Sequence, residues 1–222
     1  MWKTLKIIGV LSLLLSFSFV YKANALSINF NDPTIFGSIN NTLTDSFSAN
    51  VGGYDLLLES FGGWLYFDAV DGIGVQGPSY EDDEIECCEY FMVSFLDPFT
   101  NPFYLTDVYL TDFFIEYDNY PTLYAETGKI WTLELDGTQT IYDITATSMT
   151  GVTNGEYTFS LKQPTAVSHL LFSAPGNICV PEGQGHEFSV AGIKGNPVPE
   201  PATLLLLGVG LLGLANVARK RL

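Results

Sequence analysis

Six acidic residues occupy nine positions from Glu81 to Glu89, which makes this run the densest group of reactive side chains in the sequence. Calcium takes six to eight oxygen ligands in a flexible geometry, and carboxylates supply them well. The acids best placed as ligands are Asp83, Glu84 and Glu86, with Asp71 from the segment before the run. Two interpretations stay open, a Ca²⁺ site and a solvated acidic loop.

The three cysteines, Cys87, Cys88 and Cys179, offer a second kind of chemistry. In an oxidising compartment we expect one disulfide from Cys179 to either Cys87 or Cys88. Neighbours on a strand point to opposite faces, so only one of the pair could easily meet Cys179. Closing a loop of about 90 residues would stabilise the fold by roughly 4–5 kcal/mol in the chain-entropy model.

Residues for nucleophilic catalysis are scarce. The sequence has no Gly-x-Ser-x-Gly motif, and its only histidines are His169, in an apolar stretch, and His186, in a glycine-rich one. A Ser/His/Asp or Cys/His site would have to use one of these two. A carboxylate pair that cleaves glycosides is recognised by a separation in space, which the sequence does not give. We therefore predict a protein that is not an enzyme.

The C-terminal residues combine three features in a fixed order. Pro199-Glu200-Pro201 precedes an uncharged run of seventeen residues, 202–218, and Arg219, Lys220 and Arg221 follow it. As a helix this run would reach about 25 Å, the short end of a bilayer core. Proline suits a first helical turn, and the cations would stay on the cytoplasmic side.

This arrangement resembles the PEP-CTERM sorting signal of Gram-negative bacteria, in which Pro-Glu-Pro is recognised by a membrane protease called exosortase. The resemblance implies a precursor anchored in the inner membrane, processing of the tail, and delivery to the cell surface or to an exopolysaccharide matrix. Its sorting residues would be Pro199, Glu200 and Pro201, with the three terminal cations.

The N-terminus has the parts of a secretory signal peptide. Lys3 and Lys6 precede a fourteen-residue apolar h-region, 7–20, and Ala23-Asn24-Ala25 is a small-x-small cleavage site. We expect residues 1–25 to be removed after export, with Leu26 as the first mature residue. The predicted organisation is a signal peptide at 1–25, an exported domain at 26–196 and a sorting signal at 197–222.

Charge is distributed unevenly between these parts. The segment 26–198 holds three lysines, no arginine and 24 of the 25 acids, which gives it a formal charge of −21. Such a surface repels phosphate backbones, so we expect no nucleic-acid partner. Sixteen Phe, twelve Tyr and three Trp in the whole chain can fill a core, which argues against disorder.

Short alternating segments separated by turns fill the exported part, and no apolar repeat of helical period exceeds ten residues. Asp136-Gly137 and Asn154-Gly155 predict tight turns, the glycine-spaced segment 71–78 predicts a loop, and 90–96, apolar on both faces, predicts a central strand. The fold class is therefore all-β, as a single jelly-roll-like β-sandwich.

The segments 71–75, 83–86, 90–96 and 188–193 are similar to the β-sandwich domains that precede PEP-CTERM tails. We expect a non-catalytic surface or matrix protein, sorted through its tail and associated with exopolysaccharide. Two alternatives stay open: a jelly-roll domain that binds or cleaves glycans, and the same domain left membrane-anchored by an uncut tail.

Overall fold

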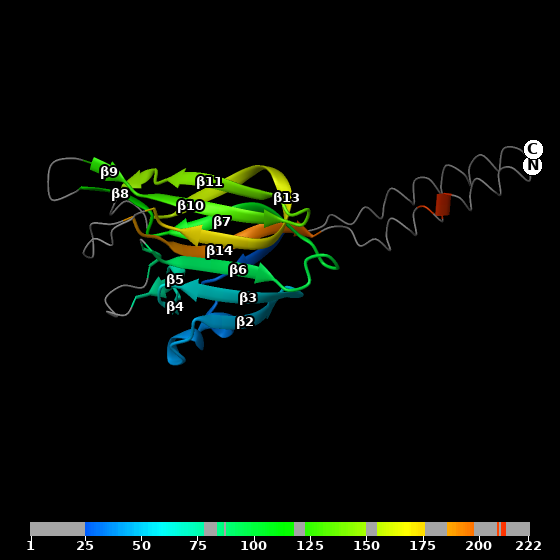
Figure 1. The fold of residues 1–222 in the computed structure, drawn as a ribbon, viewed down its shortest axis with the longest axis horizontal. Coiled ribbons are helices and arrows are strands. Elements are labelled where there is room, and N and C mark those ends of the chain that lie inside the picture. Colours follow the sequence, from blue (N-terminus) through cyan, green and yellow to red (C-terminus); the bar gives the residue numbers. More distant parts are fainter. Residues whose placement is uncertain are drawn as a thin grey trace, which may run out of the picture. The chain divides into compact units, whose positions relative to one another are not determined.

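Short segments of alternating burial make the described part of the chain predominantly β-structured, which confirms the all-β prediction (Figure 1). The computed structural model describes residues 25–77, 84–86, 88–117, 123–149, 155–175 and 186–197, together with residues 208, 210 and 211. Strand β3 shows the pattern clearly, because its residues alternate between buried and more exposed positions along the whole strand. Residues Ala25–Pro197 form one compact unit.

The strands are β1 (Leu26–Asn29), β2 (Ser46–Val51), β3 (Tyr54–Phe61), β4 (Trp64–Asp68), β5 (Gly72–Gln76), β6 (Tyr90–Phe95), β7 (Phe103–Thr111), β8 (Phe114–Tyr117), β9 (Leu123–Ala125), β10 (Thr127–Glu134), β11 (Gln139–Thr145), β12 (Ser148–Met149), β13 (Tyr157–Ser173) and β14 (Ser189–Pro197). One short helix, α2 (Pro33–Phe36), begins after Asp32, whose carboxylate accepts a hydrogen bond from the Thr34 N–H as an N-cap. A 3₁₀ turn, η1 (Ile39–Asn41), follows.

Most of the described strands belong to one eleven-stranded sheet, in the order β2-β3-β6-β13-β7-β14-β5-β4. Strand β10 joins β13 and carries β11, while β1 joins β14. Strands β12, β8 and β9 form a separate small sheet. The predicted central strand is β6, which lies between β3 and β13.

The 17-residue strand β13 connects the two parts of this sheet. Its first part, from Tyr157 to Val167, pairs with β7. Its last part pairs with β6 on one edge and with β10 on the other. Pro164 lies where the register with β7 shifts, which is where a strand tolerates proline.

The sheet is nearly closed, since its terminal strands β2 and β4 are linked by the segment before β2. The Leu65 N–H donates to the Thr44 carbonyl, 2.8 Å apart. The Asn40 side-chain amide donates a hydrogen bond to the Phe67 carbonyl at 2.6 Å and accepts one from the Phe67 N–H at 2.7 Å. The backbone of a neighbouring strand would bond Phe67 in the same way. These bonds cover the edge of β4 and reduce its tendency to pair with another chain.

Aromatic side chains fill the space that the sheet encloses. Phe91 stacks on Phe172 with ring centroids 5.8 Å apart, and Phe30 meets Phe91 edge-on at 6.0 Å. Phe95 stacks on Phe103 at 4.8 Å. These rings are buried, and contacts between the residue after β1 and strands β6, β7 and β13 form part of the core.

The glycine-spaced segment before the acidic run is a strand and not the predicted loop. Strand β5 pairs with β4 over its whole length and meets β14 at Ile73 and Val190. A Cβ on Gly72 would lie 2.3 Å from the Val190 carbonyl oxygen, so glycine is needed for this close approach. The glycine spacing, which we interpreted as the sign of a loop, instead allows the backbone of β5 to approach β14 closely.

Replacing Gly72 by alanine should destabilise the fold more than the same change at Gly137. Both glycines have positive φ, of +113° and +88°, but a Cβ on Gly137 would meet no atom within 4 Å. We expect Gly137→Ala to cost about 1–2 kcal/mol through strain alone. Gly72→Ala should add about 1–3 kcal/mol of overpacking. Thermal unfolding measures the difference, at about 2–4 °C per kcal/mol, and equal melting temperatures would contradict the close approach of β5 to β14.

Candidate functional site

The sorting motif begins where the described sheet ends. Strand β14 finishes at Pro197, which pairs with Phe103 at the start of β7. The predicted sorting residues Pro199, Glu200, Pro201, Arg219, Lys220 and Arg221 lie outside the described residues, as does Ala23. Ala25 is described and exposed, directly before β1. Within the described part of the chain, no helix has the length and apolarity to cross a bilayer.

The predicted calcium ligands are only partly described. Asp71, Glu84 and Glu86 are half-buried, and Asp83 lies outside the described residues. Among the residues that the structure describes, no three His, Cys, Asp or Glu side chains lie close enough to hold a metal ion. The Ca²⁺ site with all four ligands therefore stays a prediction.

Glu89, the last acid of the run, is buried and has a structural role that the sequence did not reveal. Only 8% of its surface is exposed, and its carboxylate accepts a hydrogen bond from the Glu86 N–H at 3.1 Å. Its own N–H donates to the Glu86 carbonyl, also at 3.1 Å. A Cβ on Gly62 would lie 3.1 Å from the Glu89 Cγ atom, so glycine makes room for this side chain.

The cysteines are also described in part. Cys88 is exposed and has a φ of +70°, in the left-handed region that non-glycine residues rarely adopt. Its side chain is therefore presented from a turn and not from a strand, unlike the geometry assumed from the sequence. Cys87 and Cys179 lie outside the described residues, and the disulfide stays a prediction.

His169 lies beside Ser168 at a bulge of β13. The His169 Nδ1 and Ser168 Oγ atoms are 2.9 Å apart. The Ser168 hydroxyl donates to the Leu133 carbonyl at 3.0 Å, and the serine is buried. Activation of a serine requires its proton to point to the histidine. Here the proton satisfies a buried carbonyl, so the pair fills a gap at the bulge where the pairing of β10 and β13 shifts.

His186, in its glycine-rich stretch, is held against the start of β10. The Thr127 N–H donates to its Nδ1 atom at 3.1 Å, which requires that nitrogen to be unprotonated. Burial lowers the pKa of His186 from its ordinary value of 6.5. The imidazole therefore acts as a neutral acceptor at neutral pH.

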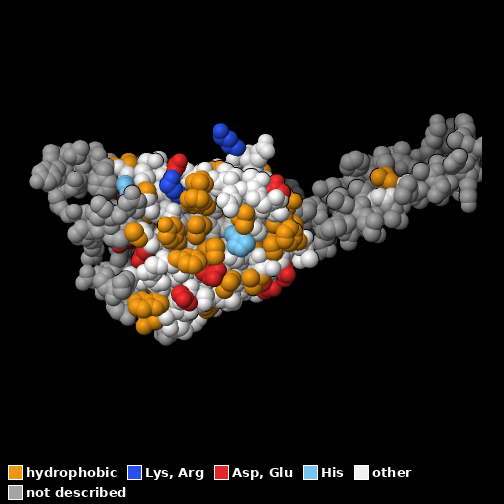
Figure 2. Space-filling view, viewed as in Figure 1, with side chains coloured by type: hydrophobic (Ala, Val, Ile, Leu, Met, Phe, Trp, Pro, Cys, Tyr) orange, Lys and Arg blue, Asp and Glu red, His pale blue; other side chains and the backbone are white. Residues whose placement is uncertain are grey.

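A row of apolar side chains crosses the outer face of β11, β10, β13 and β6. The register places Ile141 opposite Trp131, Trp131 opposite Leu171, and Leu171 opposite Met92. Their neighbours along three of the strands, Ile130, Leu170 and Phe91, point into the core, so this outer row faces away from it. Figure 2 shows hydrophobic side chains gathered over the middle of this face.

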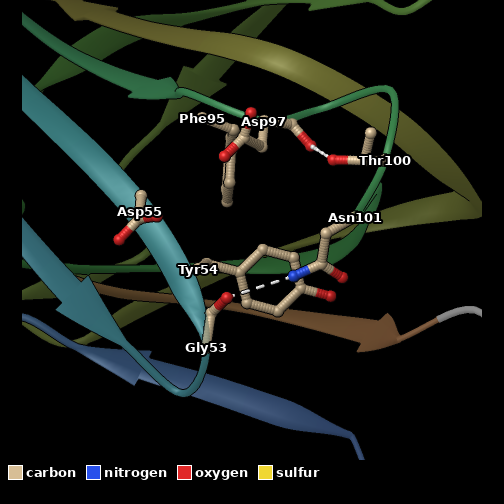
Figure 3. A pocket seen from close by; sticks show the side chains of 7 residues that line it. All are labelled: Gly53, Tyr54, Asp55, Phe95, Asp97, Thr100 and Asn101. Carbon is tan, nitrogen blue, oxygen red and sulfur yellow. Dashed lines mark hydrogen bonds between the residues drawn. The ribbon is translucent and has the colours of Figure 1, made fainter.

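A small hollow lies between the β2–β3 turn and the loop from β6 to β7 (Figure 3). Its volume is about 100 Å³, far below the roughly 300–1,000 Å³ of small-molecule pockets. The Asn101 side-chain amide donates to the Gly53 carbonyl across it at 3.1 Å. Burial raises the pKa of Tyr54, so its hydroxyl stays protonated. The Asn101–Gly53 hydrogen bond fastens the loop to the turn, and the hollow is too small for a sugar.

Acidification should destabilise the chain partly through His186. Because its folded pKa is lowered, the unfolded chain takes up a proton as the pH falls below about 6.5 while the folded chain resists. The stability contributed by the neutral imidazole is therefore complete above pH 6.5 and lost below it. In His186→Asn, an amide oxygen replaces the acceptor without titrating. We expect a smaller loss of unfolding free energy between pH 7.5 and 5 in this variant, measured by denaturant titration, and parallel profiles would contradict the assignment.

Comparisons with known proteins agree with the interpretation of the tail. The family model of the PEP-CTERM protein-sorting motif matches residues 197–221. No curated protein matches the chain, and no solved structure matches it. The matched region starts at the last residue of β14, so motif and folded domain adjoin. The chain therefore carries a PEP-CTERM sorting motif directly after an all-β domain.

Proposed function

We propose that the chain is a non-catalytic exported protein of the cell surface or extracellular matrix, which a signal peptide at residues 1–25 directs across the inner membrane and an exosortase-type protease releases from it. The PEP-CTERM motif at residues 197–221 is the observation that carries this proposal. Residues 202–218 would form the transient transmembrane helix. The β-domain, as a jelly-roll-like sandwich, is the part delivered outside.

The described histidines support a non-catalytic domain. His169 contacts a serine whose proton is held by Leu133, and His186 accepts a hydrogen bond from the Thr127 backbone. Both imidazoles thus have structural partners in places where a general base would need a substrate. The one hollow described above is too small for an organic substrate.

The outer row supports association with an uncharged polymer. The exported segment has a formal charge of −21, but the row from Ile141 to Met92 contains no ionisable side chain. The nearest lysine on β10, Lys129, is neutralised by Asp143 at 2.8 Å. An acidic polysaccharide would be repelled by such a domain, whereas a neutral one could lie along the row with Trp131 against its sugar rings.

Replacing Pro199, Glu200 and Pro201 by alanine should leave export intact and block removal of the tail. Full-length protein should then accumulate in the membrane fraction of the native host, detected by immunoblot with an antibody against the β-domain. The sequence offers a matched control, because Val180-Pro181-Glu182 repeats the first residues of the motif without an apolar run after it. Alanines at Pro181 and Glu182 should not change processing. Normal tail removal in the first variant would refute the sorting signal.

Trp131→Ala should weaken retention of the chain on neutral exopolysaccharide purified from its own host. We expect a fall of about tenfold in affinity, because the indole is the largest side chain in the outer row. Trp64, on β4, provides the control, since Trp64→Ala removes the same ring from the far end of the sheet path. If both variants bind like the unchanged chain, the outer row does not hold the polymer.

A further inference from the structure

The loop that joins β6 to β7 exposes two large apolar side chains. Phe99 is 78% exposed, the highest value among the large apolar side chains that the structure describes as exposed, and Leu96 is 52% exposed. Single exposed apolar residues are common on protein surfaces. Two in one short loop, with the larger at its tip, call for a physical account of what they contact.

Hydrogen bonds hold this loop in a fixed shape. The Leu96 N–H donates to the Asp55 carbonyl at 2.9 Å, and the Asn101 N–H donates to the Asp97 carbonyl at 3.0 Å. The Asn101 side chain adds its bond to Gly53 on the β2–β3 turn (Figure 3). Because the loop is already ordered, a contact made by Phe99 would lose little conformational entropy.

The loop lies at the end of the domain from which the sorting tail leaves. Phe103, the first residue after the loop to enter β7, pairs with Pro197, the last residue of β14. The apolar run of the tail begins at Ala202, five residues beyond Pro197. Five extended residues span at most about 18 Å, so a tail in the bilayer keeps this end of the domain next to the membrane.

We propose that Phe99 and Leu96 insert into the interface of the bilayer while the tail is still attached. The proposal rests on the membrane-anchored precursor described above. Two side chains bind a bilayer weakly on their own, but a short tether raises their effective concentration at the surface to the point where the contact is populated. Removal of the tail abolishes the tether, so the same loop does not retain the released domain.

Charge decides which lipid surface suits the loop. Asp97 lies between the two apolar residues and is exposed, and Asp55 beside it is exposed too. The domain as a whole is strongly acidic, so anionic headgroups would repel it. The fitting surface is therefore one of uncharged, zwitterionic headgroups, with the apolar side chains reaching just below them.

The chain offers a matched control at the opposite end of the domain. Phe61 is 48% exposed and ends β3, where it pairs with Tyr90 at the start of β6. Strand β6 then runs about 17 Å to Phe95, directly before the loop. Phe61 and Phe99 are thus exposed phenylalanines separated by at least the length of a strand.

The test uses the full chain in phosphatidylcholine vesicles, with either Phe99→Trp or Phe61→Trp, and with brominated lipids as quenchers. Flotation first selects chains that are anchored in the vesicles. In these, we expect the added tryptophan at position 99 to be quenched about twofold or more and the one at position 61 to match the unchanged chain. Replacing part of the lipid by phosphatidylglycerol should reduce the quenching at 99.

Each failure has a separate meaning. A chain that does not float with vesicles overturns the membrane-anchored precursor and the loop proposal together. A chain that floats but shows equal quenching at positions 61 and 99 overturns the loop proposal alone. A blue-shifted emission at 99 without bromine quenching would place the loop against protein, such as a second copy, and would also overturn the bilayer assignment.

Discussion

Hydrogen bonding along both edges of β13 is the constraint on which the rest of the structure depends. Its first part pairs with β7, and its last part lies between β6 and β10. One strand thus orders both regions of the sheet, and Phe172 from it stacks on Phe91 in the core. Without β13, the outer row would lose Leu171, which lies between Trp131 and Met92, and β7 would lose one of its paired strands.

The same strand also fixes where the tail leaves the domain. Val167 of β13 pairs with Phe103, and Phe103 pairs with Pro197 on its other side. These three residues form one cross-strand row, so the last residue of the domain is tied to β13 through β7. The end of β14 is therefore held in place by β7, and the β6–β7 loop leads directly into the β7 residue that holds it.

Local patterns predicted the all-β class and the sorting motif well. The central position of β6 followed from its apolar residues on both faces, and Pro-Glu-Pro with its apolar run is a linear signal that needs no structure. Three features depended on tertiary packing and were missed. Gly72 lets the backbone of β5 pack closely against β14, Pro164 lies at a register shift, and Glu89 is buried beside Gly62. The exposure of Phe99 was likewise hidden, because an aromatic residue in such a sequence is expected in the core.

The most direct test of the account is the intact mass of the protein recovered from the cell surface or the culture medium of its native host. Export and sorting as described predict a species that begins at Leu26 and ends near Pro199, without the apolar run at 202–218. A mass that still includes residues 202–222 would contradict release by an exosortase and would leave the domain as a permanently anchored protein.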